Sequence, residues 1–304
     1  MIGYILPFLF LSSGLIANKF ILREWSPGLL VGFRMLLSGL ILGGYALYKE
    51  KRDFLNRFKA RWLSLALLAS FAAFIPALLK AYALKNTLSS KVALIGSLDP
   101  FLTALYAYFL WHEKLTRNKL IGIVIGFTGS IILIISHSAT DVHELFGPLS
   151  LAELAAFGSV CISRLGWIKI QQLLKANIFN VKEINSICMT FAGTYSLVST
   201  AIFMPQAFSA SWSTNNIALL IYTIIGGNVI GYTLYSHLLK KHSATFVSLA
   251  GFSMPLFVYL LGWFFLGERL YPSFIFSAFI TFVGLLIFYQ DEIKREVKKE
   301  KKNL

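Results

Sequence analysis

The chain has 304 residues, of which 57% are hydrophobic and 14% are charged, and its formal net charge is +14. Soluble domains average about 25% charged residues, so the composition excludes an ordinary soluble domain and indicates a polytopic membrane protein. A positive balance can indicate nucleic-acid binding, but here the basic residues lie between apolar runs or in the tail, so we expect no nucleic-acid partner.

Ten apolar runs are long enough to be membrane-spanning helices. A helix needs about 20 apolar residues to cross roughly 30 Å of hydrocarbon, and it satisfies its own backbone hydrogen bonds. In chain order, the predicted spans are 2–22, 27–48, 62–84, 88–110, 118–137, 149–168, 184–204, 216–238, 244–266 and 271–289. The sequence therefore predicts an all-α integral membrane protein that lies in a lipid bilayer. The first run lacks the basic segment of a signal peptide, so we expect it to be retained.

The distribution of Lys and Arg predicts the orientation of these spans. If both termini are cytoplasmic, the inner loops and the basic tail 291–304 hold twenty Lys and Arg residues. The outer loops hold four, which are Arg23, Lys85, Lys91 and Arg269. This bias follows the positive-inside rule, and we expect a multi-pass protein of the inner or plasma membrane.

A spaced pattern occurs twice, at a constant offset of 155 residues, which is close to half of the chain. The matching pairs are Pro100 and Pro255, Glu113 and Glu268, and Leu115 and Leu270. Each half has five predicted spans, and because five is odd, two copies of one unit must be inverted relative to each other. We therefore expect one five-helix repeat at 1–137 and an inverted one at 138–290. Inverted repeats are typical of secondary transporters, whose substrate site lies near the midplane between the halves.

Three segments resemble the drug/metabolite transporter superfamily, in its ten-helix EamA branch. They are SPGLLVGFRMLLSGLIL (26–42), LDPFLTALYAYFLWHEKL (98–115) and SMPLFVYLLGWFFLGERL (253–270). The resemblance implies transport of small polar organic metabolites, either amino acids and their derivatives or nucleoside-type molecules such as S-adenosylmethionine. The second copy departs from the first at one position, since Met254 stands where the first copy has Asp99.

Asp99 is the strongest candidate for a substrate-binding residue. It lies midway along the predicted span 88–110, directly before Pro100, which removes a helical hydrogen bond and tends to kink the helix. A lone Asp at the bilayer centre costs ~2.5–3.5 kcal/mol, so it needs a partner, a proton or a wet cavity. Three roles stay open: a ligand for a cationic substrate group, a carrier of a coupling proton, or a structural pair with Arg34 or Lys80.

Arg34 is the second ionisable candidate for substrate binding. It follows Pro27 by seven residues, which places it roughly 10 Å deep at about 1.5 Å per residue. The other basic residues inside predicted spans are nearer to span ends, where long side chains can reach water. These are Lys19, Lys80 and Arg164.

The remaining candidates for substrate binding are polar or aromatic residues of predicted spans: Asn228, Tyr232, Tyr82, Ser253 and Trp167. Asn228 shares one helix face with Tyr232 and Tyr235, at spacings of four and seven residues. Such a set suits an organic solute with rings and polar atoms. For each aromatic residue taken singly, ordinary helix packing is the alternative.

Two further features predict packing and gating. Glycines spaced by four residues allow close approach of helices, and they occur at Gly28/Gly32, Gly39/Gly43, Gly122/Gly126 and Gly227/Gly231. Glu113 and Glu268 lie at matching span ends on opposite membrane faces. We expect them to cap helix ends or bridge loops rather than to bind substrate.

The sequence is best interpreted as a secondary transporter that works by alternating access, as an exchanger, a facilitator or a proton-coupled carrier. It contains no nucleotide-binding motif, metal-ligand spacing or catalytic motif, so we expect no cofactor and no enzyme activity. The alternatives are a membrane channel, a nucleotide-sugar-type antiporter and an integral-membrane enzyme. We expect a small-molecule substrate and a monomer or homodimer. Substrate identity and direction of transport stay open.

Overall fold

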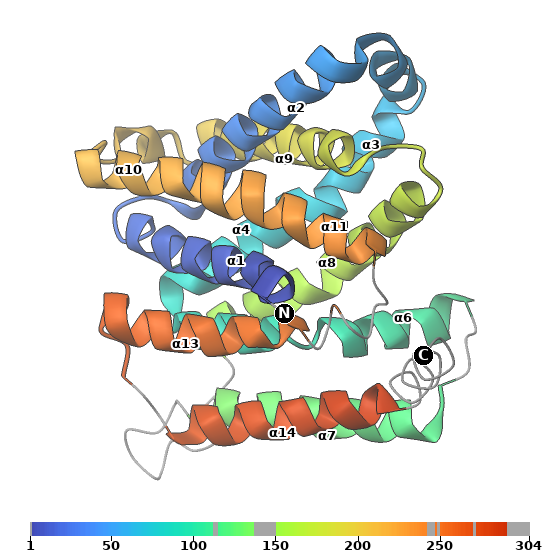
Figure 1. Ribbon diagram of the computed structural model, residues 1–304. Helices are drawn as coiled ribbons and strands as arrows, with labels where there is room; N and C mark the ends of the chain where they lie inside the picture. Colours follow the sequence, from blue (N-terminus) through green and yellow to red (C-terminus); the bar gives the residue numbers. More distant parts are fainter. Residues whose placement is uncertain are drawn as a thin grey trace.

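The computed structural model describes residues 2–111, 115–136, 150–241, 247, 250–269 and 272–290. Within these ranges the regular elements are all helical (Figure 1). The first half contains α1 (Ile2–Ile21), α2 (Pro27–Lys59), α3 (Trp62–Ala69), the π-helical segment η1 (Ser70–Phe74), α4 (Ile75–Asn86), α5 (Ser89–Gly96), α6 (Asp99–Trp111) and α7 (Arg117–Ser136). The second half contains α8 (Leu151–Lys175), α9 (Val181–Phe203), the 3-10 segment η3 (Pro205–Ser209), α10 (Thr214–Tyr222), the π-helical segment η4 (Thr223–Tyr232), α11 (Thr233–Lys241), α13 (Ser253–Leu266) and α14 (Pro272–Phe288).

Membrane-spanning character is confirmed for part of the predicted set. Five helical stretches in the described ranges are long and apolar enough to cross a bilayer: Pro27–Tyr48, Trp62–Asn86, Leu151–Lys175, Val181–Phe203 and Thr214–Leu238. Shorter apolar helices occupy Leu6–Ile21, Ser253–Leu266 and Pro272–Phe288. The structure is therefore an all-helical membrane fold, whereas the count of ten spans and the side of each terminus stay predictions. The tail 291–304, Glu113 and the start of the predicted span 244–266 lie outside the described residues.

Local capping explains where several helices begin. Ser26 caps α2, because its Oγ accepts a hydrogen bond from the Leu29 amide at 3.2 Å and Pro27 fits the first helical position. Ser150 with Glu153 and Asn180 with Glu183 form capping boxes at the starts of α8 and α9. The polar residues that begin these helices were therefore readable from the sequence.

One predicted span end agrees with the structure and one is wrong: the candidate span Pro27–Tyr48 has the predicted bounds, whereas Leu151–Lys175 extends past 168. α2 continues beyond 48 to Lys59, and α8 continues beyond 168 to Lys175. Hydropathy indicates where the apolar residues stop, and both helices continue as polar helix past that point. Arg164 consequently lies well inside α8 rather than near its end, and this changes its role.

Interruptions of the helices occur at equivalent places in the two halves. The π-helical residues 70–74 correspond, at the 155-residue offset, to 225–229, which lie inside the π-helical η4. The break between α5 and α6 at Ser97 corresponds to Phe252, the residue directly before α13. π-Helical turns and discontinuous helices are frequent at functional sites in membrane transporters.

The two closest helix pairs are antiparallel and join elements that correspond at the 155-residue offset. In α2 and α9, Gly28 faces Thr200 and Gly39 faces Thr190, so one number rises as the other falls. In α7 and α14, Gly122 faces Phe288, and Gly129 faces Thr281. Figure 1 shows α7 and α14 lying side by side. The predicted close packing is confirmed at Gly28, Gly39 and Gly122.

The helices between these two pairs form the centre of the molecule. α1 packs against η4 and α13, while α8 packs against α4, α5 and α6. Figure 1 shows α1 lying between the α10–α11 line and α13. The apolar core among them includes Leu15, Val31, Ala81, Val92, Ala156 and Ile224. A cavity lies among these same helices.

Candidate functional site

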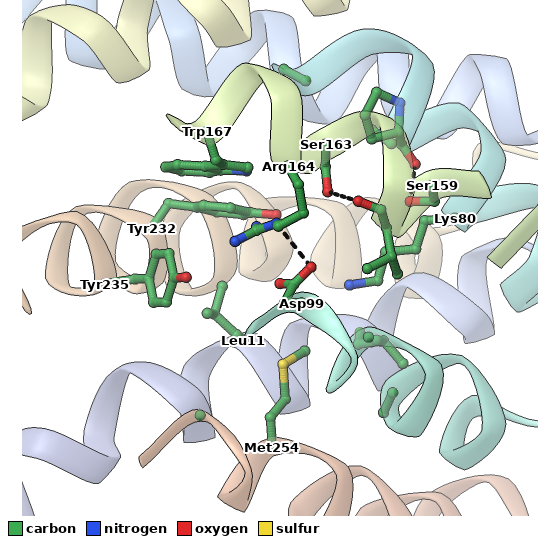
Figure 2. A pocket seen from close by; sticks show the side chains of 18 of the residues that line it. Leu11, Lys80, Asp99, Ser159, Ser163, Arg164, Trp167, Tyr232, Tyr235 and Met254 are labelled. Atoms are coloured by element: carbon green, nitrogen blue, oxygen red, sulfur yellow. Dashed lines mark hydrogen bonds and ion pairs between the residues drawn. The ribbon is translucent and has the colours of Figure 1, made fainter. Parts of the chain in front are cut away.

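The cavity has a volume of about 510 Å³ and is lined by both halves of the chain. Pockets for small organic ligands measure about 300–1,000 Å³, so it can hold a metabolite. Five of its polar lining residues come from five different helices. They are Asn18 of α1, Arg34 of α2, Lys80 of α4, Asp99 of α6 and Arg164 of α8. Figure 2 shows part of this lining at close range.

Asp99 forms an ion pair with Arg164 at the first residue of α6. The distance from Arg164 Nε to Asp99 Oδ1 is 2.9 Å. The contact is ionic, since Nε lacks hydrogen-bond geometry. Lys80 also acts electrostatically on Asp99, and Figure 2 shows Asp99 between these two cations. The structural pair considered with Arg34 or Lys80 is therefore made with Arg164, which lies inside α8 and lines the cavity.

An aromatic cluster lies beside this pair, formed by Trp167, Tyr232 and Tyr235 (Figure 2). The Trp167 and Tyr232 rings are parallel within 4° with centroids 6.3 Å apart, and Trp167 meets Tyr235 edge-on at 5.8 Å. All three line the cavity. Aromatic faces of this kind stack with planar rings and attract cations.

Arg34 and Asn228 form a second polar group on the cavity wall. Arg34 Nη1 donates to Asn228 Oδ1 at 2.8 Å, and Asn228 Nδ2 donates to Ser38 Oγ at 3.0 Å. Asn228 is fully buried and lies within η4. The sequence predicted both Arg34 and Asn228 as site residues, and the structure places them in direct contact.

Two predicted site residues lie elsewhere. Tyr82 is absent from the described cavity lining, and its side chain is 39% exposed on the surface of the protein. Ser253 Oγ donates to the Ala250 carbonyl at 2.6 Å, and its neighbours Gly251, Phe252, Met254 and Pro255 line the cavity in its place.

The cavity is electropositive. Among the lining residues that the structure describes, the cations Arg34, Lys80, Lys119 and Arg164 accompany a single acid, Asp99. Fixed charges of one sign raise the local concentration of ligands that carry the other. The excess of cations in the cavity therefore attracts anionic groups.

The comparisons with known proteins agree with this geometry. The model of the EamA-like transporter family matches residues 1–135 and 150–290. The chain belongs to this family. It is a multi-pass membrane protein of a metabolite-transporter family, which confirms the resemblance of its repeated segments.

Two relatives of this chain illustrate the range of similar proteins. An S-adenosylmethionine/S-adenosylhomocysteine transporter of Chlamydia muridarum (strain MoPn / Nigg) is 28% identical over 292 residues, covering 93% of this chain and 89% of the relative. A chloroplastic WAT1-related protein of Arabidopsis thaliana is 26% identical, covering 92% and 67%. One solved crystal structure matches with a TM-score of 0.67 at 17% identity over 94% of both chains, which shows the fold alone.

In this EamA-like transporter, Glu268 lies away from the cavity polar groups and connects three elements. Its Oε1 accepts hydrogen bonds from Lys19 Nζ at 2.7 Å and from the Ser89 amide at 2.9 Å, while Oε2 accepts from Ser89 Oγ at 2.8 Å. Lys19 also donates to the Thr87 carbonyl at 2.6 Å. The predicted bridging and capping role of Glu268 is confirmed, and Lys19 is a pairing residue rather than a side chain that reaches water.

Sequence reasoning missed Arg164 and Lys80 as cavity residues. Both were assigned to span ends, yet both line the cavity of the EamA-like transporter. One signal could have identified Arg164, since it precedes Trp167 by three residues and such residues share a helix face.

Proposed function

We propose that this EamA-like transporter carries S-adenosylmethionine, S-adenosylhomocysteine or amino-acid-derived solutes of similar size across the inner or plasma membrane by alternating access. The observation that carries the proposal is the cavity shared by the two halves, with the Asp99–Arg164 pair beside an aromatic cluster. The similarity to the S-adenosylmethionine/S-adenosylhomocysteine transporter of Chlamydia muridarum supports this choice of substrates.

The helix arrangement supports alternating access between two inverted repeats, 1–137 and 138–290. The family model matches in two stretches, one in each proposed repeat. Corresponding helices α2/α9 and α7/α14 pack antiparallel, as inverted copies require. The interruptions at Ser97 and Phe252 also correspond. A two-fold unit of this kind can expose one site to each side in turn by rocking.

The substrate contacts in this proposal follow from chemistry. Asp99 accepts a cationic group or a coupling proton, and the aromatic cluster packs against a planar ring such as a nucleobase. A sulfonium group would also be stabilised by aromatic faces. Arg34 and Asn228 supply donors and an acceptor at another part of the wall. Exchange, facilitated flux and proton coupling are all compatible with this site.

The test is uptake of radiolabelled S-adenosylmethionine into proteoliposomes that contain the purified chain. Protein-free liposomes serve as the control, and unlabelled S-adenosylhomocysteine, amino acids and nucleosides serve as competitors. The proposal expects saturable uptake that S-adenosylhomocysteine inhibits and that accelerates when unlabelled substrate is preloaded. Uptake no faster than in protein-free liposomes would contradict the proposed substrates. Inhibition by an amino acid but not by S-adenosylhomocysteine would assign the amino acid as the substrate instead.

The same assay separates a carrier from a channel. A channel passes solute without saturation and without acceleration by internal substrate. Linear, non-exchanging flux would therefore favour the channel.

A further inference from the structure

The guanidinium of Arg34 has one edge that makes no hydrogen bond or ion pair in the part of the chain that the structure describes. Nη1 donates to Asn228 Oδ1, whereas Nε is buried and has no hydrogen-bond partner. No acidic side chain forms an ion pair with Arg34 anywhere in the described ranges. Arginine keeps its positive charge in proteins, so Arg34 is a cation without a matching anion on the cavity wall.

The neighbours of Arg34 determine which edge of its guanidinium group makes no hydrogen bond. Asn228 Nδ2 donates to Ser38 Oγ at 3.0 Å and to the Arg34 carbonyl at 3.3 Å, which points Oδ1 at the guanidinium. Ser38 Oγ in turn donates to the Arg34 carbonyl at 2.6 Å. Since Oδ1 holds Nη1, the unused donors are Nε and Nη2, which project from the same side of the planar group. Two parallel donors form the fork that binds both oxygens of a carboxylate.

The other cavity cations are less suited to this role. Arg164 is already paired with Asp99 at 2.9 Å. Lys80 also acts on that carboxylate, and its ammonium is a point charge without a planar fork. Arg34 combines a fork without hydrogen-bond partners with a polar network that holds it in place.

We propose that the Nε–Nη2 edge of Arg34 is the subsite for a carboxylate of the transported solute, with Asn228 and Ser38 as positioning residues. The inference rests on the proposed function and names the group that substrates share, so esters, amides and decarboxylated analogues are poor substrates. A phosphate would use the same donors, and binding of a nucleotide instead of a carboxylic acid is therefore an outcome of the test.

The test measures equilibrium binding to the purified full chain by calorimetry. Two ligand pairs differ at the carboxylate alone: S-adenosylhomocysteine with its carboxamide, and L-methionine with L-methioninamide. The protein variants are Arg34→Gln, Arg34→Lys and, as a matched control, Arg23→Lys, since Arg23 is exposed and is not among the described lining residues. Melting temperature and gel-filtration profile report whether each variant is folded.

The expected result is a preference of the wild type for each bound acid over its amide by about 10-fold to 100-fold. Arg34→Gln abolishes that preference by weakening the acid and leaving the amide nearly unchanged. Arg34→Lys retains part of the preference, and Arg23→Lys retains all of it.

Three results would overturn the inference. The first is equal affinity of the wild type for the acid and the amide. The second is a folded Arg34→Gln variant whose affinities for the acid and the amide fall by the same factor. The third is tight binding of adenosine 5′-monophosphate where neither acid binds, which would assign the edge to phosphate. If no compound binds the wild type, the proposed function fails together with this inference, whereas equal binding of acid and amide removes this inference alone.

Discussion

Arg164 Nε and Asp99 Oδ1 lie 2.9 Å apart in the cavity lining, although the two residues belong to different predicted repeats. Asp99 begins α6 directly after a break in the helix, and Arg164 lies inside α8. The pair therefore joins the two halves at the place where a substrate must bind if the halves rock against each other. Its Asp99 side chain is 33% exposed, so a carboxylate oxygen remains accessible to a cationic group.

Replacement of Asp99 by Asn should reduce substrate uptake in proteoliposomes by at least about 10-fold, because a hydrogen bond to a charged group contributes roughly 1.5–3 kcal/mol. The pH dependence of uptake should also change if this carboxylate carries a proton. Initial rates from pH 5.5 to 8 would measure both effects. Wild-type rates combined with a wild-type pH profile would remove Asp99 from the mechanism.

Substitution of Tyr232 by Leu should raise the KM for a nucleoside-type substrate by roughly 5-fold to 10-fold, since aromatic pairs contribute about 0.5–1.5 kcal/mol beyond their buried area. Tyr108→Leu is the matched control, because Tyr108 is 45% exposed on the outside of α6 and does not line the described cavity. The KM values for uptake by the two variants show whether Tyr232 contacts the substrate ring. Equal kinetic changes in both would deny Tyr232 a place at the ring of the substrate.

Gly39→Ala should destabilise the protein by about 1–3 kcal/mol, because overpacking a close contact forces helices apart. A Cβ at Gly39 would lie 2.9 Å from Thr190 Cα, which belongs to the backbone of α9. Gly44→Ala on the same helix meets nothing within 4 Å and should be neutral or stabilising by up to about 1 kcal/mol. Thermal unfolding in detergent compares them, and a Gly39→Ala variant as stable as Gly44→Ala would contradict close α2/α9 packing.

Glu268→Gln should lower stability by roughly 3–5 kcal/mol, as expected when one partner of a largely buried ion pair is removed. The amide cannot accept all three hydrogen bonds that Lys19 and Ser89 give to the carboxylate. Arg269→Gln is the control, since the neighbouring Arg269 is exposed. Chemical denaturation measures the difference, and indistinguishable midpoints would mean that Glu268 does not hold α1, α5 and α13 together.

The cavity residues that could be predicted from the sequence are polar residues within otherwise apolar helices. Asp99, Arg34 and Asn228 were identified in this way, and all three line the cavity. Their contacts were not predictable, because hydropathy locates the bilayer rather than the end of a helix. Since α8 continues to Lys175, Arg164 lies inside the helix rather than at its end, and its side chain pairs with Asp99.

The face of an aromatic residue was the hardest feature to predict. Lys80 lines the cavity, and Tyr82 lies two residues later, about 200° around the helix at 3.6 residues per turn. The two side chains therefore point in nearly opposite directions. Composition alone cannot decide which of them faces the cavity, whereas the packing of α4 against α8 does.

The inverted arrangement of the two repeats can be tested directly by site-specific labelling. Asn56 and Ser211 are exposed and correspond at the 155-residue offset. Each is replaced by Cys in a background where Cys161 and Cys188 are Ala, and intact cells are treated with a membrane-impermeant maleimide. The account predicts that the label reaches Cys at position 211 from outside and reaches position 56 only after the cells are opened. Labelling of both positions from the same side would show parallel halves and contradict the account.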